Sequence, residues 1–189
     1  MFANSKVETI QLNRSYRSAK PIIELTKHII PNGKEIEAFN RDGKKPLCIK
    51  MNDEQERVES IIDKARDLQE KGHKSIAIIC KTNEECMKAM ELIGDKLDYH
   101  LVQKENTTYE KGVVIIPAYL AKGIEFDAVI IFDASSDIYS KESERNLFYV
   151  ACTRAMHELY VYYAGEITTM LSKVPKALFQ NETSKGRDA

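Results

Sequence analysis

The chain has 189 residues, 30% of them charged and 43% hydrophobic, which is typical of a globular domain and not of a disordered segment. A formal net charge of −1 and a pI near 6.5 give no overall basic excess that would indicate nucleic-acid binding, although a local groove is still compatible with it. No apolar run reaches eighteen residues and no charged-then-apolar leader opens the chain, so we expect a cytoplasmic protein without membrane contact. The four cysteines form no CxxC pair and the histidines are scattered, so we expect buried thiols and no metal site.

The first half of the chain alternates between short apolar runs and segments of helical period. The expected elements are a strand at 7–12, a helix at 18–30, a strand at 46–51, a helix from 53 to about 71, a strand at 75–80 and a helix at 83–93. Asp53 and Asn83 are the expected N-caps of two of these helices, and Gly72 and Gly94 their expected ends. The run SIAIIC at 75–80 is apolar throughout, which indicates a strand buried on both faces of a parallel sheet.

The second half continues the same alternation. Its expected elements are strands at 99–103, 113–116 and 128–132, a helix at 143–156 and a last strand at 158–163. This order predicts an α/β fold with a mostly parallel, doubly wound sheet and helices on both faces. The sequence turns polar after residue 173, so we expect a folded domain at 1–173 and a flexible tail at 174–189.

The stretch LNRSYRS at 12–18 lies at an expected strand-to-helix junction. Ligands of open α/β sheets bind outside the carboxyl ends of the strands. There Tyr16 could stack on a base, and the planar guanidinium of Arg17 could pair with phosphate oxygens. The alternative is a solvated basic turn with Tyr16 half buried, and these residues alone leave both interpretations open.

Two further stretches carry candidate site residues. In AKGIEFD at 121–127, Gly123 allows a tight turn or a close approach to a ligand, and Glu125 could accept a hydrogen bond from a ribose hydroxyl. The alternative is an N-cap and a charge pair on a crossover. Arg154 lies near the end of the helix at 143–156, where its charge could meet an anion, reach solvent or pair with the helix dipole.

These three stretches resemble motifs of the UvrD/Rep-type superfamily 1 helicases. NRSYRS resembles the NYRS motif of that family, AKGIEFD resembles AKGLEFD, and LFYVACTRA at 147–155 resembles LLYVAITRA. The Leu-to-Ile and Ile-to-Cys differences are conservative, and the matches follow the family order from residue 12 to residue 155. The resemblance implies the C-terminal RecA-like (2A) domain of such a helicase, with the fold of the P-loop NTPases.

The resemblance also implies ATP as the ligand and a role for each matching residue. The implied contacts are Tyr16 to the adenine; Glu125 to the ribose, with Lys122 and Gly123 shaping its loop; and Arg17 and Arg154 to the γ-phosphate, as arginine fingers. Cations that reach across a cleft stabilise the charge that develops on the transferred phosphoryl group.

The motif G-x-x-x-x-G-K-[ST], known as Walker A, does not occur in the chain. The phosphates and Mg²⁺ would therefore be held mainly by an upstream RecA-like domain of the same native polypeptide, and this chain alone would not hydrolyse ATP. Asp133 follows an apolar run as a Mg²⁺-binding aspartate would, but without a P-loop we interpret it as a turn or cap residue.

Two departures from the family pattern bear on the substrate. Pro117 and Tyr119 stand where UvrD-type enzymes usually carry a Thr and a His that face single-stranded DNA, although Tyr119 could stack on a base. Only about a hundred residues separate Arg17 from Lys122, too few for the inserted subdomain of UvrD and Rep. This spacing and the stretch PAYLAKGIEFD look more like the helicase IV-like proteins, some of whose relatives act on RNA polymerase.

We therefore expect the C-terminal ATPase-core domain of an ATP-dependent DNA helicase or translocase. Its expected partners are the upstream RecA-like domain and single-stranded DNA. One alternative places the same core in a factor that remodels or recycles RNA polymerase. A second alternative is a non-catalytic α/β nucleotide-sensing module.

Overall fold

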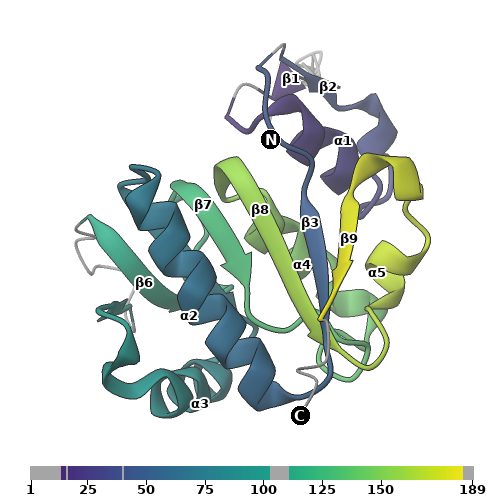
Figure 1. Cartoon of the computed structure of the whole chain (residues 1–189). Helices are drawn as coiled ribbons and strands as arrows, with labels where there is room; N and C mark the ends of the chain where they lie inside the picture. Colours follow the sequence, from purple (N-terminus) through teal and green to yellow (C-terminus); the bar gives the residue numbers. More distant parts are fainter. Residues whose placement is uncertain (1–13, 16, 40, 103–110, 185–189) are drawn as a thin grey trace, which may run out of the picture.

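The computed structural model describes residues 14–15, 17–39, 41–102 and 111–184 and is built around a seven-stranded sheet (Figure 1). The strand order is β5-β6-β4-β7-β8-β3-β9, and all neighbours in it pair in parallel. The strands are β3 (Leu47–Met51), β4 (Ser75–Cys80), β5 (His100–Leu101), β6 (Gly112–Pro117), β7 (Phe126–Ile131), β8 (Ala155–Ala164) and β9 (Gln180–Thr183). The predicted parallel α/β sheet is confirmed; the strand expected at 7–12 lies outside the described residues.

Helices cover both faces of the sheet, as predicted. One face carries α2 (Glu54–Glu70) and α3 (Asn83–Ile93), and the other carries α1 (Lys20–Thr26), α4 (Arg145–Cys152) and α5 (Thr169–Ser172) (Figure 1). Alternate residues of each strand therefore enter different cores: in β4, Ile76 and Ile78 pack toward α2 and α3, whereas Ala77 and Ile79 pack toward α1 and α4. Burial of these side chains on both faces explains why the central strands are apolar throughout.

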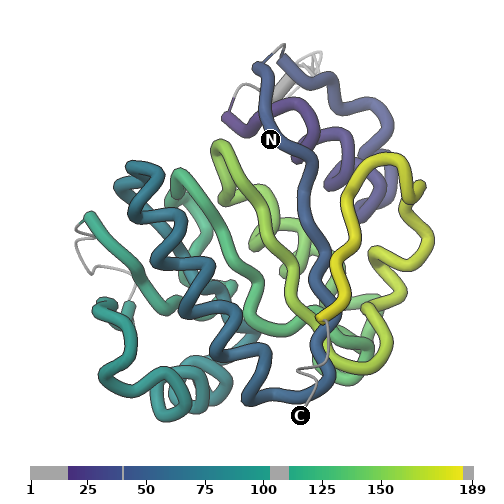
Figure 2. The backbone as a smooth tube through the Cα atoms, in the orientation of Figure 1, coloured from purple at the N-terminus to yellow at the C-terminus, as the bar shows by residue number. Residues whose placement is uncertain are grey.

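Short elements complete the fold. A two-stranded parallel sheet joins β1 (Arg14–Ser15) to β2 (Glu37–Ala38), and single 3₁₀ turns lie at Gly33–Glu35, Gly94–Lys96, Glu142–Glu144 and Lys176–Leu178. The tube in Figure 2 shows this N-terminal segment beside the C-terminal segment, at one side of the main sheet. No helix in the described part of the chain is long and apolar enough to cross a membrane.

Helix boundaries follow capping chemistry with two corrections. The Asp53 carboxylate accepts the Glu56 amide at 2.8 Å and begins α2, as expected. The N-cap of α3 is Thr82 and not Asn83, because the Thr82 hydroxyl accepts the Glu85 amide at 3.2 Å. The helix expected at 143–156 is shorter, because the chain already enters the sheet at Ala155, which pairs with Phe126 of β7.

The expected flexible tail at 174–189 was wrong for its first part. Val174 is buried, and β9 pairs with β3 as the last strand of the sheet. The Gln180 amide donates to the Pro46 carbonyl at 2.9 Å, and the Ser184 amide donates to the Lys50 carbonyl at 2.9 Å. All four side chains of β9 are exposed, so an edge strand held through its backbone can form from a polar sequence that carries no apolar signal.

Candidate functional site

The starts of β7 and β8 lie side by side and bring two of the predicted site residues together. Glu125 directly precedes β7 and Arg154 directly precedes β8, and the Phe126 amide donates to the Arg154 carbonyl at 2.9 Å. Since the sheet is parallel, residues that precede neighbouring strands meet at its amino edge. The candidate site is therefore at the amino ends of β7 and β8.

This position corrects one expectation. Arg17 was expected outside the carboxyl ends of the sheet strands. It does follow a strand, but that strand is β1 of the small two-stranded sheet. Relative to the main sheet, Arg17 reaches the amino edge, where it contacts Glu125.

The Arg154 side chain is held by neutral acceptors. Its Nε donates to the Val150 carbonyl at 3.1 Å, its Nη1 to the Ile124 carbonyl at 3.4 Å and its Nη2 to the Thr153 hydroxyl at 3.3 Å. Among the described residues no carboxylate lies within 4 Å of this guanidinium. Burial lowers the pKa of Arg154, the positive charge of Arg17 lowers it further, and Glu125 opposes both. The orientation of the guanidinium is thus fixed, while no carboxylate of the described residues is paired with its charge.

Arg17 and Glu125 form an ion pair at the same edge of the sheet, beside the amino ends of β7 and β8. The Arg17 Nε lies 2.7 Å from the Glu125 Oε1, and the side chains are 64% and 34% exposed. A pair this exposed contributes at most about 1 kcal/mol to stability. It therefore costs little to rearrange these side chains around a ligand.

Both arginines line one pocket of about 160 Å³. Its walls are formed by Arg17, Ser18, Ile23, Thr26, Ile36, Tyr149, Val150, Thr153 and Arg154. Two guanidinium groups beside hydroxyl groups suit an anion with several oxygens, such as a phosphate. Tyr16, the predicted base-stacking residue, lies outside the described residues. The sequence did not indicate Tyr149 or Thr26, because their types and spacing are those of ordinary helix residues.

The loop from 118 to 125 carries two other predicted features, the possible DNA contact Tyr119 and the Lys122-Gly123 turn before Glu125. It begins at the carboxyl end of β6 and reaches the amino end of β7, packing its buried residues Ala118, Leu120 and Ala121 against the sheet. Tyr119, which is 52% exposed, therefore lies at the opposite edge of the sheet from Glu125. Lys122 is exposed, and Gly123 has a φ of +91°, a conformation that favours glycine.

Asp133 has a structural role at the carboxyl end of β7. Its carboxylate forms a buried ion pair with Arg57 of α2 and accepts the Ser135 amide at 2.9 Å, in agreement with the predicted turn role. The Arg57 guanidinium also lies 4.8 Å from the centre of the Phe132 ring. The described residues contain no group of three or more His, Cys, Asp or Glu side chains placed to hold a metal ion.

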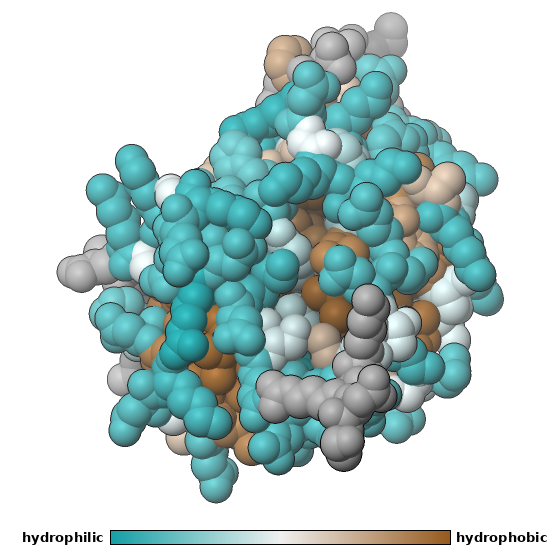
Figure 3. Space-filling model, viewed as in Figure 1, coloured by the Kyte–Doolittle hydropathy of each residue, from teal (hydrophilic) through white to brown (hydrophobic). Residues whose placement is uncertain are grey.

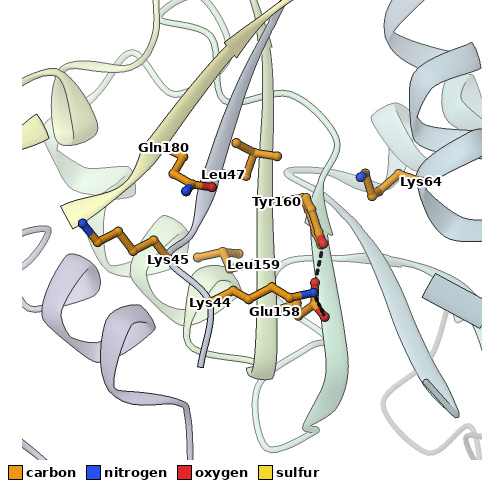
Figure 4. A pocket seen from close by; sticks show the side chains of 8 residues that line it. All are labelled: Lys44, Lys45, Leu47, Lys64, Glu158, Leu159, Tyr160 and Gln180. Atoms are coloured by element: carbon orange, nitrogen blue, oxygen red, sulfur yellow. Dashed lines mark hydrogen bonds and ion pairs between the residues drawn. The ribbon is translucent and has the colours of Figure 1, made fainter. Parts of the chain in front are cut away.

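A second pocket, of about 280 Å³, lies near the amino ends of β3, β8 and β9 (Figure 4). Burial favours a raised pKa for Glu158, but the Tyr160 hydroxyl, Lys44 at 3.1 Å and His73 at 3.1 Å all bond to the carboxylate and lower it to about 2. Because Lys44 balances the charge of Glu158 and the Tyr160 hydroxyl and His73 bond to its oxygens, the pocket has the interactions of a structural ion-pair cluster. Figure 3 shows hydrophilic side chains over most of this face, with hydrophobic patches in front of the sheet between them.

Comparison with known proteins agrees with the fold. A family model described as the UvrD-like helicase C-terminal domain matches residues 10–106, and a second of the same description matches residues 112–162. The structure resembles the C-terminal domain of a possible DNA helicase from Lactobacillus plantarum WCFS1, with 34% identity over 88% of this chain and 98% of that chain and a TM-score of 0.77.

The fold extends to more distant proteins. Domain 2 of the DEAD-box helicase Mss116p, solved with an RNA duplex, is 8% identical over 77% of this chain and 66% of that chain, with a TM-score of 0.52. At that identity the likeness shows the RecA-like fold alone. No curated protein matches this chain. With more than half of its length matched by one family model and a close structural relative, this chain belongs to the UvrD-like helicase C-terminal domain family.

Proposed function

We propose that this domain supplies half of the ATP site of an ATP-dependent superfamily 1 DNA helicase or translocase. The observation that carries the proposal is the convergence of Arg17 and Arg154, far apart in sequence, on one pocket with Glu125 beside them. An upstream RecA-like domain with a P-loop would hold the β- and γ-phosphates and most of the Mg²⁺ coordination.

The contacts of Arg154 fit an arginine finger. A guanidinium has five N–H donors, and three of its nitrogens here donate to neutral groups that fix its direction. N–H groups on Nη1 and Nη2 stay available for a phosphate oxygen. Because its orientation is set before ATP arrives, the charge can stabilise the transition state without reorganisation.

Arg17 and Glu125 fit the remaining ATP contacts. In the proposal Arg17 turns toward the γ-phosphate, which is a stronger partner than an exposed carboxylate. Glu125 would then accept from the ribose hydroxyls, with Lys122 and Gly123 shaping its loop. Tyr16 would stack on the adenine.

Tyr119 is the proposed contact to single-stranded DNA. Its exposed ring lies at the opposite edge of the sheet from the arginine pocket, so one domain can hold both ligands without overlap. Nothing in the described residues favours RNA polymerase as a partner or a purely nucleotide-sensing role.

Steady-state ATPase kinetics of the full-length helicase test the proposal. Arg154→Ala and Arg17→Ala should lower kcat by about 10³-fold or more while the KM for ATP changes little, because the contacts strengthen in the transition state. Tyr16→Ala should chiefly raise KM. Lys should not restore kcat at either arginine, because its point charge lacks the planar fork.

Arg66→Ala is the matched control. Arg66 lies on α2 and, like Arg154, donates to a backbone carbonyl, that of Lys96, but far from the pocket. The kcat of the Arg66→Ala enzyme should stay at the wild-type value. An Arg154→Ala enzyme with wild-type kcat would overturn the proposal.

A further inference from the structure

Arg41 links the turn that carries Arg17 to the start of β8. Its Nη1 donates to the backbone carbonyl of Arg17 at 2.9 Å. Its Nη2 lies 3.2 Å from the Nε2 and 3.4 Å from the Nδ1 of His157, a residue of β8. One planar side chain thus joins two segments that both contribute to the candidate ATP site.

The backbone around Arg41 holds the same turn. The Lys20 amide donates to the Arg41 carbonyl at 2.8 Å, and the Ala19 amide donates to the carbonyl of Met156 at 2.8 Å. A Cβ added at Gly43 would lie 2.4 Å from the Cβ of Ala19, so the segment 41–43 approaches the turn closely. The residues after Arg17 are therefore pressed between this segment and β8.

We propose that Arg41 is a positioning residue of the ATP site, which fixes the Arg17 peptide relative to β8 through His157. The inference rests on the proposed function. The side chain of Arg17 is 64% exposed and its ion pair with Glu125 is weak, so the direction of its guanidinium depends on its backbone. A displacement of about 1 Å in a group that contacts the reacting phosphate can lower the rate about 10²-fold.

His157 makes this link sensitive to acid. Arg41 only donates, so the ring of His157 must accept, and a doubly protonated ring cannot. Among the described residues, the ionisable groups around the ring are Arg41, Asp127 at 3.9 Å, Glu158 and, 6.3 Å away between ring centres, His73. Burial and then Arg41 lower the pKa of His157 against the opposing pull of Asp127, so the ring stays an acceptor at neutral pH.

The experiment compares Arg41→Ala with Arg66→Ala in the full-length helicase. Arg41→Ala should lower kcat by about 10- to 100-fold with little change in the KM for ATP, and Arg41→Lys should not rescue it, because one ammonium lacks the planar fork. In the 189-residue chain, Arg41→Ala should speed hydrogen exchange at the Ala19 and Lys20 amides. Arg66→Ala should change neither quantity.

His157→Asn is a second variant for the case in which Arg41→Ala does not fold. Asn keeps an acceptor but does not titrate. The wild-type kcat should therefore fall as the pH drops below 6.5, through the lowered pKa of His157, and the variant should lack this acid limb. An identical acid limb in both proteins would contradict the role of His157.

The outcomes separate this inference from the proposed function. If Arg17→Ala lowers kcat but Arg41→Ala matches wild type in kcat and amide exchange, the positioning role of Arg41 is wrong and the ATP site stands. If Arg17→Ala leaves kcat unchanged, the proposed function fails. Amide exchange still reports in that case whether Arg41 holds the turn.

Discussion

Replacement of Asp133 by Ala tests whether this residue has a structural role. The substitution leaves the Arg57 guanidinium buried, with Arg57 only 4% exposed and its Nε without a hydrogen-bond partner among the described residues. Glu54, at 3.3 Å and with a side chain that is 37% exposed, and the Phe132 ring stay in contact with the guanidinium. Breaking a buried ion pair on one side costs about 3–5 kcal/mol, and Glu54 should keep the loss near the lower end.

The assay is thermal and urea unfolding of the 189-residue chain. A loss of about 3–5 kcal/mol corresponds to a fall in Tm of roughly 6–20 °C for a domain of this size. The double variant Arg57→Met with Asp133→Leu removes both charges and should recover most of the loss. A change below about 1 kcal/mol for Asp133→Ala would refute the structural assignment and reopen the question of a ligand at this carboxylate.

Three further predictions concern pH, catalysis and DNA. Burial raises the pKa of Glu85 to about 7, so the folded state favours the protonated acid. The protonated acid therefore stabilises the fold fully below pH 4.5, and this stabilisation is lost as the pH rises through about 7. Urea titrations of the wild type should show a fall of about 3 kcal/mol in the free energy of unfolding over this range, and Glu85→Gln should not show it. Equal pH dependence in the two proteins would contradict this prediction. The isolated chain should show no ATPase activity; turnover that co-purifies with it and disappears in Arg154→Ala would disprove that. Tyr119→Ala should weaken single-stranded DNA binding by the full-length helicase by about 1–3 kcal/mol in anisotropy titrations, and an unchanged Kd would remove Tyr119 from the DNA path. For the isolated domain we expect a salt-dependent Kd of about 10⁻⁴–10⁻⁶ M.

The sequence predicts the central sheet well because burial on both faces leaves a clear signal. The run at 75–80 corresponds to β4 residue for residue, and Asp53 caps α2 as its spacing indicates. The polar strand β9 leaves no such signal, since only its backbone is paired. The early end of α4 also depends on a distant contact, the pairing of Ala155 with Phe126.

The sequence predicts three charged residues of the candidate site, but neither the other residues that line the pocket nor its place in the fold. The motifs identify Arg17, Glu125 and Arg154, but the strand-end rule points to the wrong edge of the sheet. Arg41 and His157 lie outside the motifs, and only the folded chain brings them to the Arg17 turn. Positioning residues of this kind act through backbone geometry, which local sequence does not encode.

A structure of the full-length helicase with a non-hydrolysable ATP analogue and Mg²⁺ tests the central claim most directly. We predict that the guanidinium groups of Arg17 and Arg154 lie about 2.7–3.2 Å from γ-phosphate oxygens, and that the P-loop of the upstream domain holds the other side. A nucleotide bound by the upstream domain alone, with both arginines turned away from the phosphates, would contradict the account.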